Sequence, residues 1–163
     1  MEERSMIEQL RIQLNWTKED MEKFLEEIAK VISEEVAVGA GESDIFKNMS
    51  DHIYKKRIAK LLMLLGIPTN IGGYKFIKLA LVYLRSKESE KISITEELYP
   101  YIAKFYNKTV GQVERAIRSA VEMACKVNSV KFQEIFDNIN LPKSGKPTNS
   151  LFITALDEYL RYN

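Results

Sequence analysis

Hydrophobic side chains recur every three or four residues along most of this 163-residue chain, with polar side chains between them. That spacing is typical of helices that bury one face. Residues 1–16 fit a strand period and a helical period equally well. Because strand signals are almost absent elsewhere and connections are short, we expect an all-α fold. The predicted helices cover residues 17–38, 51–65, 72–86, 96–106, 109–125, 129–138 and the chain from Asn149 or Ser150 onward.

The first of these helices is acidic and amphipathic. Thr17 and Asp20 have the spacing of a capping pair, and Gly39 and Gly41 are expected to end the helix in a linker, GAGESD. Glutamates cover its polar faces, so its apolar stripe must pack on something. Three roles stay open: packing on the rest of the domain, self-association, and electrostatic shielding of a basic face. The stripe consists of Met21, Phe24, Leu25, Ile28, Val31 and Ile32.

Turn residues mark the ends of the later helices. Asp51 or a neighbour is expected to cap the next helix, which Gly66 ends. Thr95 is expected to cap the helix over 96–106, with Pro100 in its first turns, where a missing N–H costs least. The last helix follows a loop, LPKSGKPTN, with two prolines and a glycine.

The segment from Thr95 to Ala124 has the pattern of a helix-turn-helix. Ala103 is a small residue at which the two helices can approach closely, and Thr109 with Gln112 forms a capping box at the start of the second helix. A two-helix corner with a merely solvated outer face is the alternative. We expect the second helix to bury Val110, Val113, Ile117, Ala120, Val121 and Ala124. Its other faces carry Gly111, Gln112, Glu114, Arg115, Arg118 and Ser119, and arginine, glutamine and glutamate suit guanine, adenine and cytosine edges respectively.

Charge is distributed unevenly, although the net charge is only +1. Residues 1–51 hold 6 basic and 13 acidic side chains, a net charge of −7, and residues 52–163 hold 18 and 10, a net charge of +8. A basic module attracts anions, and nucleic acid is the commonest large one. A lysine-rich solvated surface without a partner is equally compatible with these charges.

Other function classes find no support in the sequence. Cys125 is the single cysteine and His52 the single histidine, which excludes a disulfide framework and paired-histidine metal sites. We expect no cofactor, no metal, no small-molecule substrate and no enzymatic activity, because no phosphate-binding loop or nucleophile motif occurs. No apolar run has the length of a membrane span and the N-terminus lacks the apolar centre of a signal peptide, so we expect no membrane partner and a cytoplasmic protein.

Three blocks within residues 53–163 resemble a known family. They are LLGIPTNIGGYKFIKLAL, ITEELYPYIAKFYNKTVGQVERAIRSAVEMA and GKPTNSLFI, and the runs VERAIR and KPTNS are the most specific parts. The family is the C-terminal effector domain of the bacterial sporulation response regulator, stage-zero sporulation protein A. The resemblance implies an all-helical domain that binds a short asymmetric box in double-stranded DNA, often as tandem head-to-tail dimers.

The resemblance also assigns roles to residues of the second helix. Glu114 and Arg115 match the base-contacting pair of the family, and Arg118 matches another arginine of that helix. Gln112 stands in place of an arginine that usually reads guanine, and Ser119 in place of a frequent histidine, so the resemblance implies the docking mode but not the target sequence. We expect base contacts from Gln112, Glu114 and Arg115. Groove or phosphate contacts are expected from Thr109, Gly111, Arg118, Ser119, Lys143 and Lys146.

The front of the chain departs from the family pattern. The family's regulators begin with a phosphate-accepting receiver domain, and residues 1–50 lack its strand–helix alternation, so we expect no phosphorelay control in cis. We expect residues 1–50 to form an acidic helical segment for packing or dimerisation, and residues 51–163 to form a sequence-specific DNA-binding transcription regulator. The alternative is an interaction module that pairs with or antagonises a full-length regulator. A homodimer, in tandem on DNA or through the N-terminal helix, fits the first function.

Overall fold

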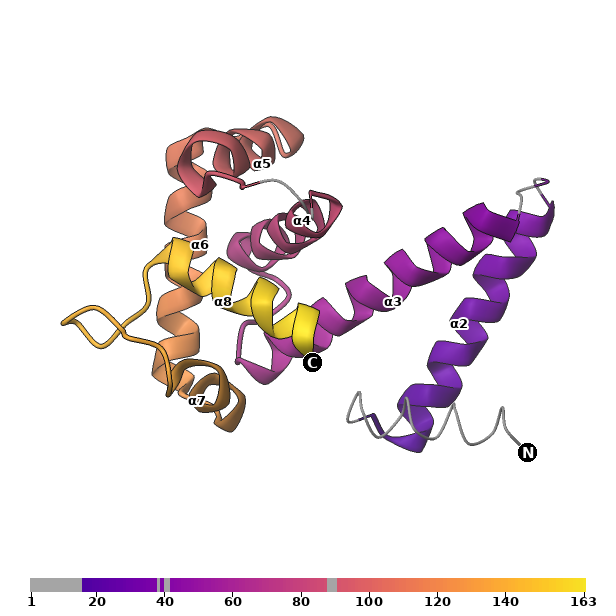
Figure 1. The fold of residues 1–163 in the computed structure, drawn as a ribbon, viewed down its shortest axis with the longest axis horizontal. Helices are drawn as coiled ribbons and strands as arrows, with labels where there is room; N and C mark the ends of the chain where they lie inside the picture. The colour runs from indigo at the N-terminus through magenta and orange to yellow at the C-terminus, as the bar shows by residue number, and fades with distance from the viewer. Residues whose placement is uncertain (1–15, 38, 40–41, 88–90) are drawn as a thin grey trace. The chain divides into compact units, whose positions relative to one another are not determined.

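The computed structural model describes residues 16–37, 39, 42–87 and 91–163, and all regular structure in these ranges is helical (Figure 1). The all-α prediction is therefore confirmed, whereas the ambiguous segment 1–15 lies outside the described residues. No helix in these ranges is both long and apolar enough to cross a bilayer. The elements are α2 (Lys18–Ala37), α3 (Glu42–Leu64), α4 (Gly72–Ser86), η1 (Ile94–Leu98, a π-helix), α5 (Tyr99–Phe105), α6 (Val110–Val127), α7 (Val130–Phe136) and α8 (Asn149–Tyr162).

The chain divides into two compact units, residues 1–57 and 58–163, with α3 running from the first into the second. In the first unit, the predicted capping pair is confirmed. The Thr17 N–H donates to Asp20 Oδ2 at 2.9 Å, and the Asp20 N–H donates to Thr17 Oγ1 at 3.1 Å. Two backbone N–H groups at the start of α2, which have no acceptor within the helix, thus each donate to a side chain of the pair.

A polar cluster joins α2 to α3 within the first unit. The carboxylate of Glu27 accepts from Lys56 Nζ at 2.9 Å and lies 3.2 Å from His52 Nε2. The Lys56 ammonium lowers the pKa of Glu27, and His52 adds to this effect while desolvation opposes it. The His52 ring also stacks on Phe24, which meets Trp16 edge-on at 4.8 Å between centroids.

Helix α3 begins at Glu42, nine residues before the start predicted near Asp51. The prediction of a linker over GAGESD was wrong for its last three residues. Amphipathic periodicity is weak over 42–50, so the pattern gave no helical signal there.

The predicted end of α3 is confirmed at Gly66. Its φ is +76°, its N–H donates to Met63 O at 2.9 Å, and the Ile67 N–H donates to Leu62 O at 3.0 Å. These two bonds form a Schellman motif, which requires a left-handed residue and so favours glycine.

The second unit is built around the crossing of α4 and α6. A Cβ atom on Gly73 would overlap the Ala116 carbonyl oxygen and lie 2.7 Å from the Ala120 Cβ. Small residues on both helices therefore let the backbones approach closely. Helix α8 packs on α4 and α6, and α7 packs on α8. The fully buried core includes Leu62, Ile77, Leu98, Ile102, Ile117, Phe152, Ile153 and Leu156.

The segment before α5 corrects a second prediction. Ser93, not Thr95, is the N-cap: its Oγ accepts from the Glu96 N–H at 3.3 Å, and its N–H donates to Glu97 Oε1 at 3.0 Å. Thr95 lies inside η1, where the Ser93 carbonyl accepts from Leu98 at 3.1 Å in the π-helical pattern. Ser93 followed by Glu96 is itself a capping-box spacing, so this signal was present in the sequence.

Candidate nucleic-acid interface

Helices α5 and α6 are joined by the tight turn predicted for a helix-turn-helix. Asn107 has a φ of +51°, the Lys108 N–H donates to Ala103 O at 2.8 Å, and the Asn107 N–H donates to Lys104 O at 3.3 Å. This is again a Schellman motif, here with asparagine in the left-handed position, which asparagine tolerates better than most residues. Ala103 is buried at this corner as expected. The turn fixes the direction in which α6 leaves α5.

The start of α6 is held by the predicted capping box. Thr109 Oγ1 accepts from the Gln112 N–H at 3.2 Å, and Gln112 Oε1 accepts from the Thr109 N–H at 3.0 Å. The Gln112 side chain is exposed but its carbonyl oxygen is engaged. Only its amide N–H₂ group remains available to an outside acceptor in this arrangement.

One face of α6 is buried and the opposite face meets solvent. Val113, Ile117, Ala120, Val121 and Ala124 are buried, as predicted. Val110 is 39% exposed, so its predicted burial was wrong. As the first residue of α6 it lies outside the crossing with α4, which is at Ala116 and Ala120. The solvent-facing residues of α6 include Gly111, Gln112, Arg115, Arg118, Ser119, Glu122 and Lys126.

Arg115 lies opposite the buried face of α6 by helical spacing. Its side chain is exposed, and its guanidinium has no hydrogen bond or ion pair with any residue that the structure describes. Its backbone carbonyl accepts from Ser119 Oγ at 3.1 Å, which directs that hydroxyl back onto the helix. Arg115 therefore presents a free planar group with five donors to solvent.

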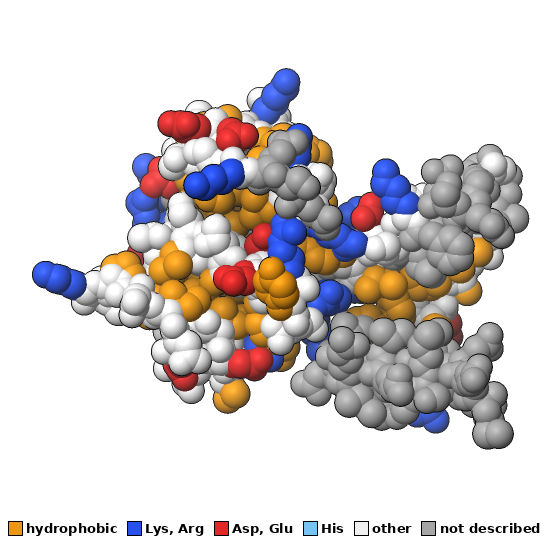
Figure 2. Space-filling model, in the orientation of Figure 1, with side chains coloured by type: hydrophobic (Ala, Val, Ile, Leu, Met, Phe, Trp, Pro, Cys, Tyr) orange, Lys and Arg blue, Asp and Glu red, His pale blue; other side chains and the backbone are white. Residues whose placement is uncertain are grey.

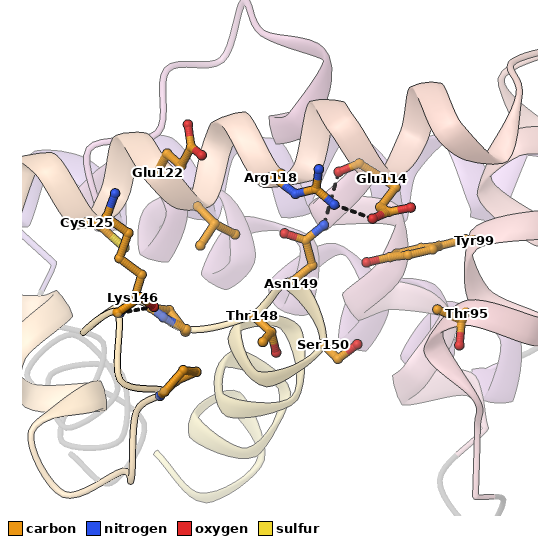
Figure 3. A pocket seen from close by; sticks show the side chains of 14 residues that line it. Thr95, Tyr99, Glu114, Arg118, Glu122, Cys125, Lys146, Thr148, Asn149 and Ser150 are labelled. Carbon is orange, nitrogen blue, oxygen red and sulfur yellow. Dashed lines mark hydrogen bonds and ion pairs between the residues drawn. The ribbon is translucent and has the colours of Figure 1, made fainter.

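Glu114 and Arg118 form an ion pair on the flank of α6 that faces the start of α8 (Figure 3). Glu114 is half-buried, and its backbone carbonyl accepts from Asn149 Nδ2 at 3.0 Å. The structure thus separates Glu114 and Arg118 from the face that carries Arg115 and Gln112. Residues grouped together in the sequence lie on two adjacent faces of one helix.

Lys143 and Lys146 lie in the loop between α7 and α8, and both are exposed. Gly145, with a φ of +69°, donates its N–H to Pro142 O at 2.8 Å and closes the loop tightly. Figure 2 shows a basic side chain at the outer tip of this loop. Lys146 lines the same pocket as Arg118, which places two cations beside the flank of α6.

Comparison with known families gives a match that covers all but the last three residues of the second unit. The model of the sporulation initiation factor Spo0A C-terminal family matches residues 58–160. The chain belongs to this family. The Spo0A C-terminal family is a family of DNA-binding effector domains that regulate transcription in sporulation, not a family of enzymes. The resemblance predicted from VERAIR and KPTNS is confirmed.

Two residues that the sequence did not single out for this site lie behind the flank of α6 in this Spo0A C-terminal domain. Asn149, the first residue of α8, links α8 to α6 through Glu114, and its side chain lies beside that of Tyr99 (Figure 3). Tyr99 is 2% exposed, and burial raises the pKa of its phenol. The KPTNS run contains Asn149, but nothing in the sequence alone showed which helix its amide reaches.

A surface pocket of about 390 Å³ lies between α6 and the loop before α8 in this Spo0A C-terminal domain (Figure 3). Its charged lining consists of Glu114, Arg118, Glu122 and Lys146. Cys125 also lines the pocket and is half-buried, and burial raises the pKa of its thiol, so the thiol is held neutral. Among the described residues there is no cluster of three or more potential metal ligands.

Proposed function

We propose that this chain is a sequence-specific DNA-binding transcription regulator that inserts α6 into the major groove. The orientation of Arg115 is the observation that carries the proposal. Its side chain is exposed, free of partners in the described part of the chain, and carried on the side of the helix opposite its buried residues. Arginine in this position can donate two hydrogen bonds to O6 and N7 of guanine.

Gln112 and Glu114 are proposed to complete base recognition. Gln112 can donate its amide N–H₂ to a base while its carbonyl stays in the capping box. Glu114 can accept from cytosine N4 with the oxygen that Arg118 leaves free, since a carboxylate accepts several hydrogen bonds. Arg118 then lies between Glu114 and the groove edge.

The remaining proposed contacts are to the backbone of the DNA. Gly111 has open space around it, so the start of α6 can approach a phosphate without obstruction by a side chain. Lys143 and Lys146 are exposed cations on a loop beside the flank of α6. Thr109 and Ser119 border the outer face. Residues 58–163 hold 15 basic and 10 acidic side chains, so the unit as a whole attracts DNA.

The front segment is proposed to regulate this binding. Residues 1–50 contribute an acidic helix, and a homodimer in tandem on DNA or through this segment fits the proposal. Exposed glutamates such as Glu22 and Glu26 give α2 a negative outer surface. If they repel DNA, replacing both with glutamine tightens duplex binding at low salt, and an unchanged affinity contradicts this role.

Selection from a randomised duplex library, followed by titration, tests the proposed function. The selected duplex and a shuffled duplex are titrated at two salt concentrations, because specific contacts survive salt better than phosphate contacts do. We expect the selected duplex to bind more tightly than the shuffled duplex at both salt concentrations. Equal affinity for the two duplexes at physiological ionic strength contradicts sequence-specific recognition.

One observation favours a second candidate, an interaction module that pairs with a full-length regulator. The Gln112 carbonyl and one Glu114 oxygen are already engaged within α6, which leaves Arg115 as the single base reader with no internal partner among the described residues. In that case the chain binds duplexes weakly and without discrimination, yet forms a stoichiometric complex with a full-length regulator. Sedimentation of the mixed proteins distinguishes the two functions.

A further inference from the structure

A continuous row of aromatic rings joins α4, α5 and the turn after α5. It runs from the buried Phe76 to the half-buried Tyr83, and its most exposed member is Phe105, which is 62% exposed. Tyr101, on the same side of α5 one turn earlier, is 38% exposed. The centroid distances are 5.2 Å for Phe76–Tyr106, 5.0 Å for Tyr106–Phe105, 6.4 Å for Phe105–Tyr101 and 4.3 Å for Tyr101–Tyr83.

The outer members of this row are not needed by the core. The residues that α5 buries are Tyr99, Ile102 and Ala103, on the opposite side of the helix. Hydrophobic side chains are visible at the surface beside α5 in Figure 2. Apolar side chains that are exposed next to one another, rather than singly, are typical of contact surfaces.

Helices α4 and α5, which carry the row, hold basic side chains and no acidic ones, and the nearest carboxylates along the described chain are Glu96 and Glu97 in η1. Residues 72–86 and 99–108 contain no aspartate or glutamate. Lys104 lies three residues after Tyr101 and adjacent to Phe105, and Lys108 follows in the turn; both are exposed and have no carboxylate partner among the described residues. The basic residues of the two segments are Lys75, Lys78, Arg85, Lys104 and Lys108.

We propose that this aromatic face, made of Tyr83, Tyr101 and Phe105 with Lys104 and Lys108, binds an acidic amphipathic helix of another protein. An apolar side chain of that helix covers Phe105, and its carboxylates meet the two lysines. This is a contact separate from the DNA face, because α5 carries it rather than the outer face of α6.

Charge and ring geometry disfavour the other occupants. The same face of a second copy brings like charges together, which opposes an isologous dimer. In helix α2 of a second copy Met21 and Ile28 are already buried, so these residues are not free to cover Phe105. Bases of a single strand need open ring faces, whereas Tyr83 and Tyr101 lie against each other at 4.3 Å with a tilt of 35°.

A designed peptide tests the proposal. The probe is a labelled helical peptide with leucines at positions i, i+3, i+4 and i+7 and glutamates between them; a second peptide has lysines in place of the glutamates. Fluorescence anisotropy with the full chain should show binding of the acidic peptide only. Phe105→Ala should weaken that binding about tenfold or more, as expected for an exposed anchor that becomes buried. Val130→Ala, at an apolar residue of α7 that is 82% exposed, is the matched control and should leave the affinity for the acidic peptide unchanged.

Charge reversal provides the second arm. The double variant Lys104→Glu with Lys108→Glu should lose the acidic peptide and gain the basic one. Duplex binding by Phe105→Ala should stay at the wild-type level, so failure of this proposal is distinguishable from failure of DNA binding. The proposal is overturned if the acidic peptide does not bind, if Phe105→Ala leaves its affinity unchanged, if Phe105→Ala instead dissociates a wild-type dimer in sedimentation velocity, or if the face binds an unpaired oligonucleotide rather than the peptide.

Discussion

Glu114 is ion-paired with Arg118 one turn further along α6, and the pair lies beside the face that carries Arg115 rather than on it. A carboxylate and a cation that the sequence assigned separately to DNA thus neutralise each other in the free protein. Asn149 holds the backbone of the same turn from α8. The pair therefore influences how much positive charge α6 offers to phosphates.

Replacing Glu114 with glutamine releases the full charge of Arg118. If Arg118 then contacts a phosphate, the slope of log affinity against log salt concentration for a shuffled duplex should steepen by about 0.9. Glu122→Gln is the matched control, because it removes an exposed carboxylate of the same helix, whereas the ion pair of Arg118 is with Glu114. Identical slopes for the two variants exclude a restraining role for Glu114.

Arg115→Ala and Lys146→Ala should affect binding in different ways. Loss of a bidentate guanine contact should cost about 1–3 kcal/mol of discrimination between the selected and shuffled duplexes. Loss of a phosphate contact should weaken both duplexes alike and flatten the salt dependence. Paired titrations measure both quantities, and undiminished discrimination by Arg115→Ala removes this residue from base recognition.

Gln112→Glu separates capping from recognition. Glutamate at this position keeps the box with Thr109 and adds a negative charge at the helix start, so unfolding free energy should be unchanged or higher. Thr109→Ala should lower it by about 1 kcal/mol through loss of the cap. Gln112→Glu should at the same time weaken duplex binding, since it places a charge beside the phosphates. Chemical denaturation and titration of the same samples check both effects.

The two glycines of the α4–α6 region should respond oppositely to alanine. Gly73→Ala forces a methyl group into Ala116 and Ala120, which should destabilise the fold by roughly 1–3 kcal/mol or more. Gly111→Ala meets open space and should stabilise α6 by about 0.5–1 kcal/mol. A gain in stability together with weaker duplex binding by Gly111→Ala indicates that the start of α6 approaches DNA closely.

The polar cluster around Glu27 should make the stability of the first unit depend weakly on pH. The pKa of the Glu27 carboxyl is lower in the folded protein than in the unfolded chain. The stabilisation is therefore present above the pKa of the unfolded chain and is lost as the pH falls through the pKa of the folded protein. The partners are 44% and 41% exposed, which limits the effect to about 0–1 kcal/mol. The unfolding free energies of the wild type and of Glu27→Gln should converge at low pH and differ near neutrality.

Helix boundaries could be predicted wherever local chemistry decides them. Thr17 with Asp20, Thr109 with Gln112, and Gly66 each satisfy backbone groups within a few residues, and all three are confirmed. The start of α3 could not be predicted from a hydrophobic pattern, because its first turns have weak amphipathicity. Ser93 was missed in favour of Thr95, although the spacing to Glu96 pointed to it.

The site could be predicted only in part, for a related reason. The buried and exposed sides of α6 follow from its own periodicity. The engagement of Glu114, by contrast, depends on Arg118 adopting one rotamer and on Asn149 arriving from a helix 35 residues away. Contacts between distant segments are set by tertiary packing, which one sequence does not reveal.

The residues of α6 that pack in the core are different from those that face outward, and this separation affects how the DNA specificity of the domain can evolve. Val113, Ile117, Ala120 and Ala124 secure the helix, while Gln112, Arg115 and Ser119 add nothing to the core. Arg115 and Ser119 can therefore be replaced without unfolding the protein, and Gln112 can be exchanged for residues that keep the capping box with Thr109. A library varied at these three positions should yield variants with new operator preferences on an unaltered scaffold.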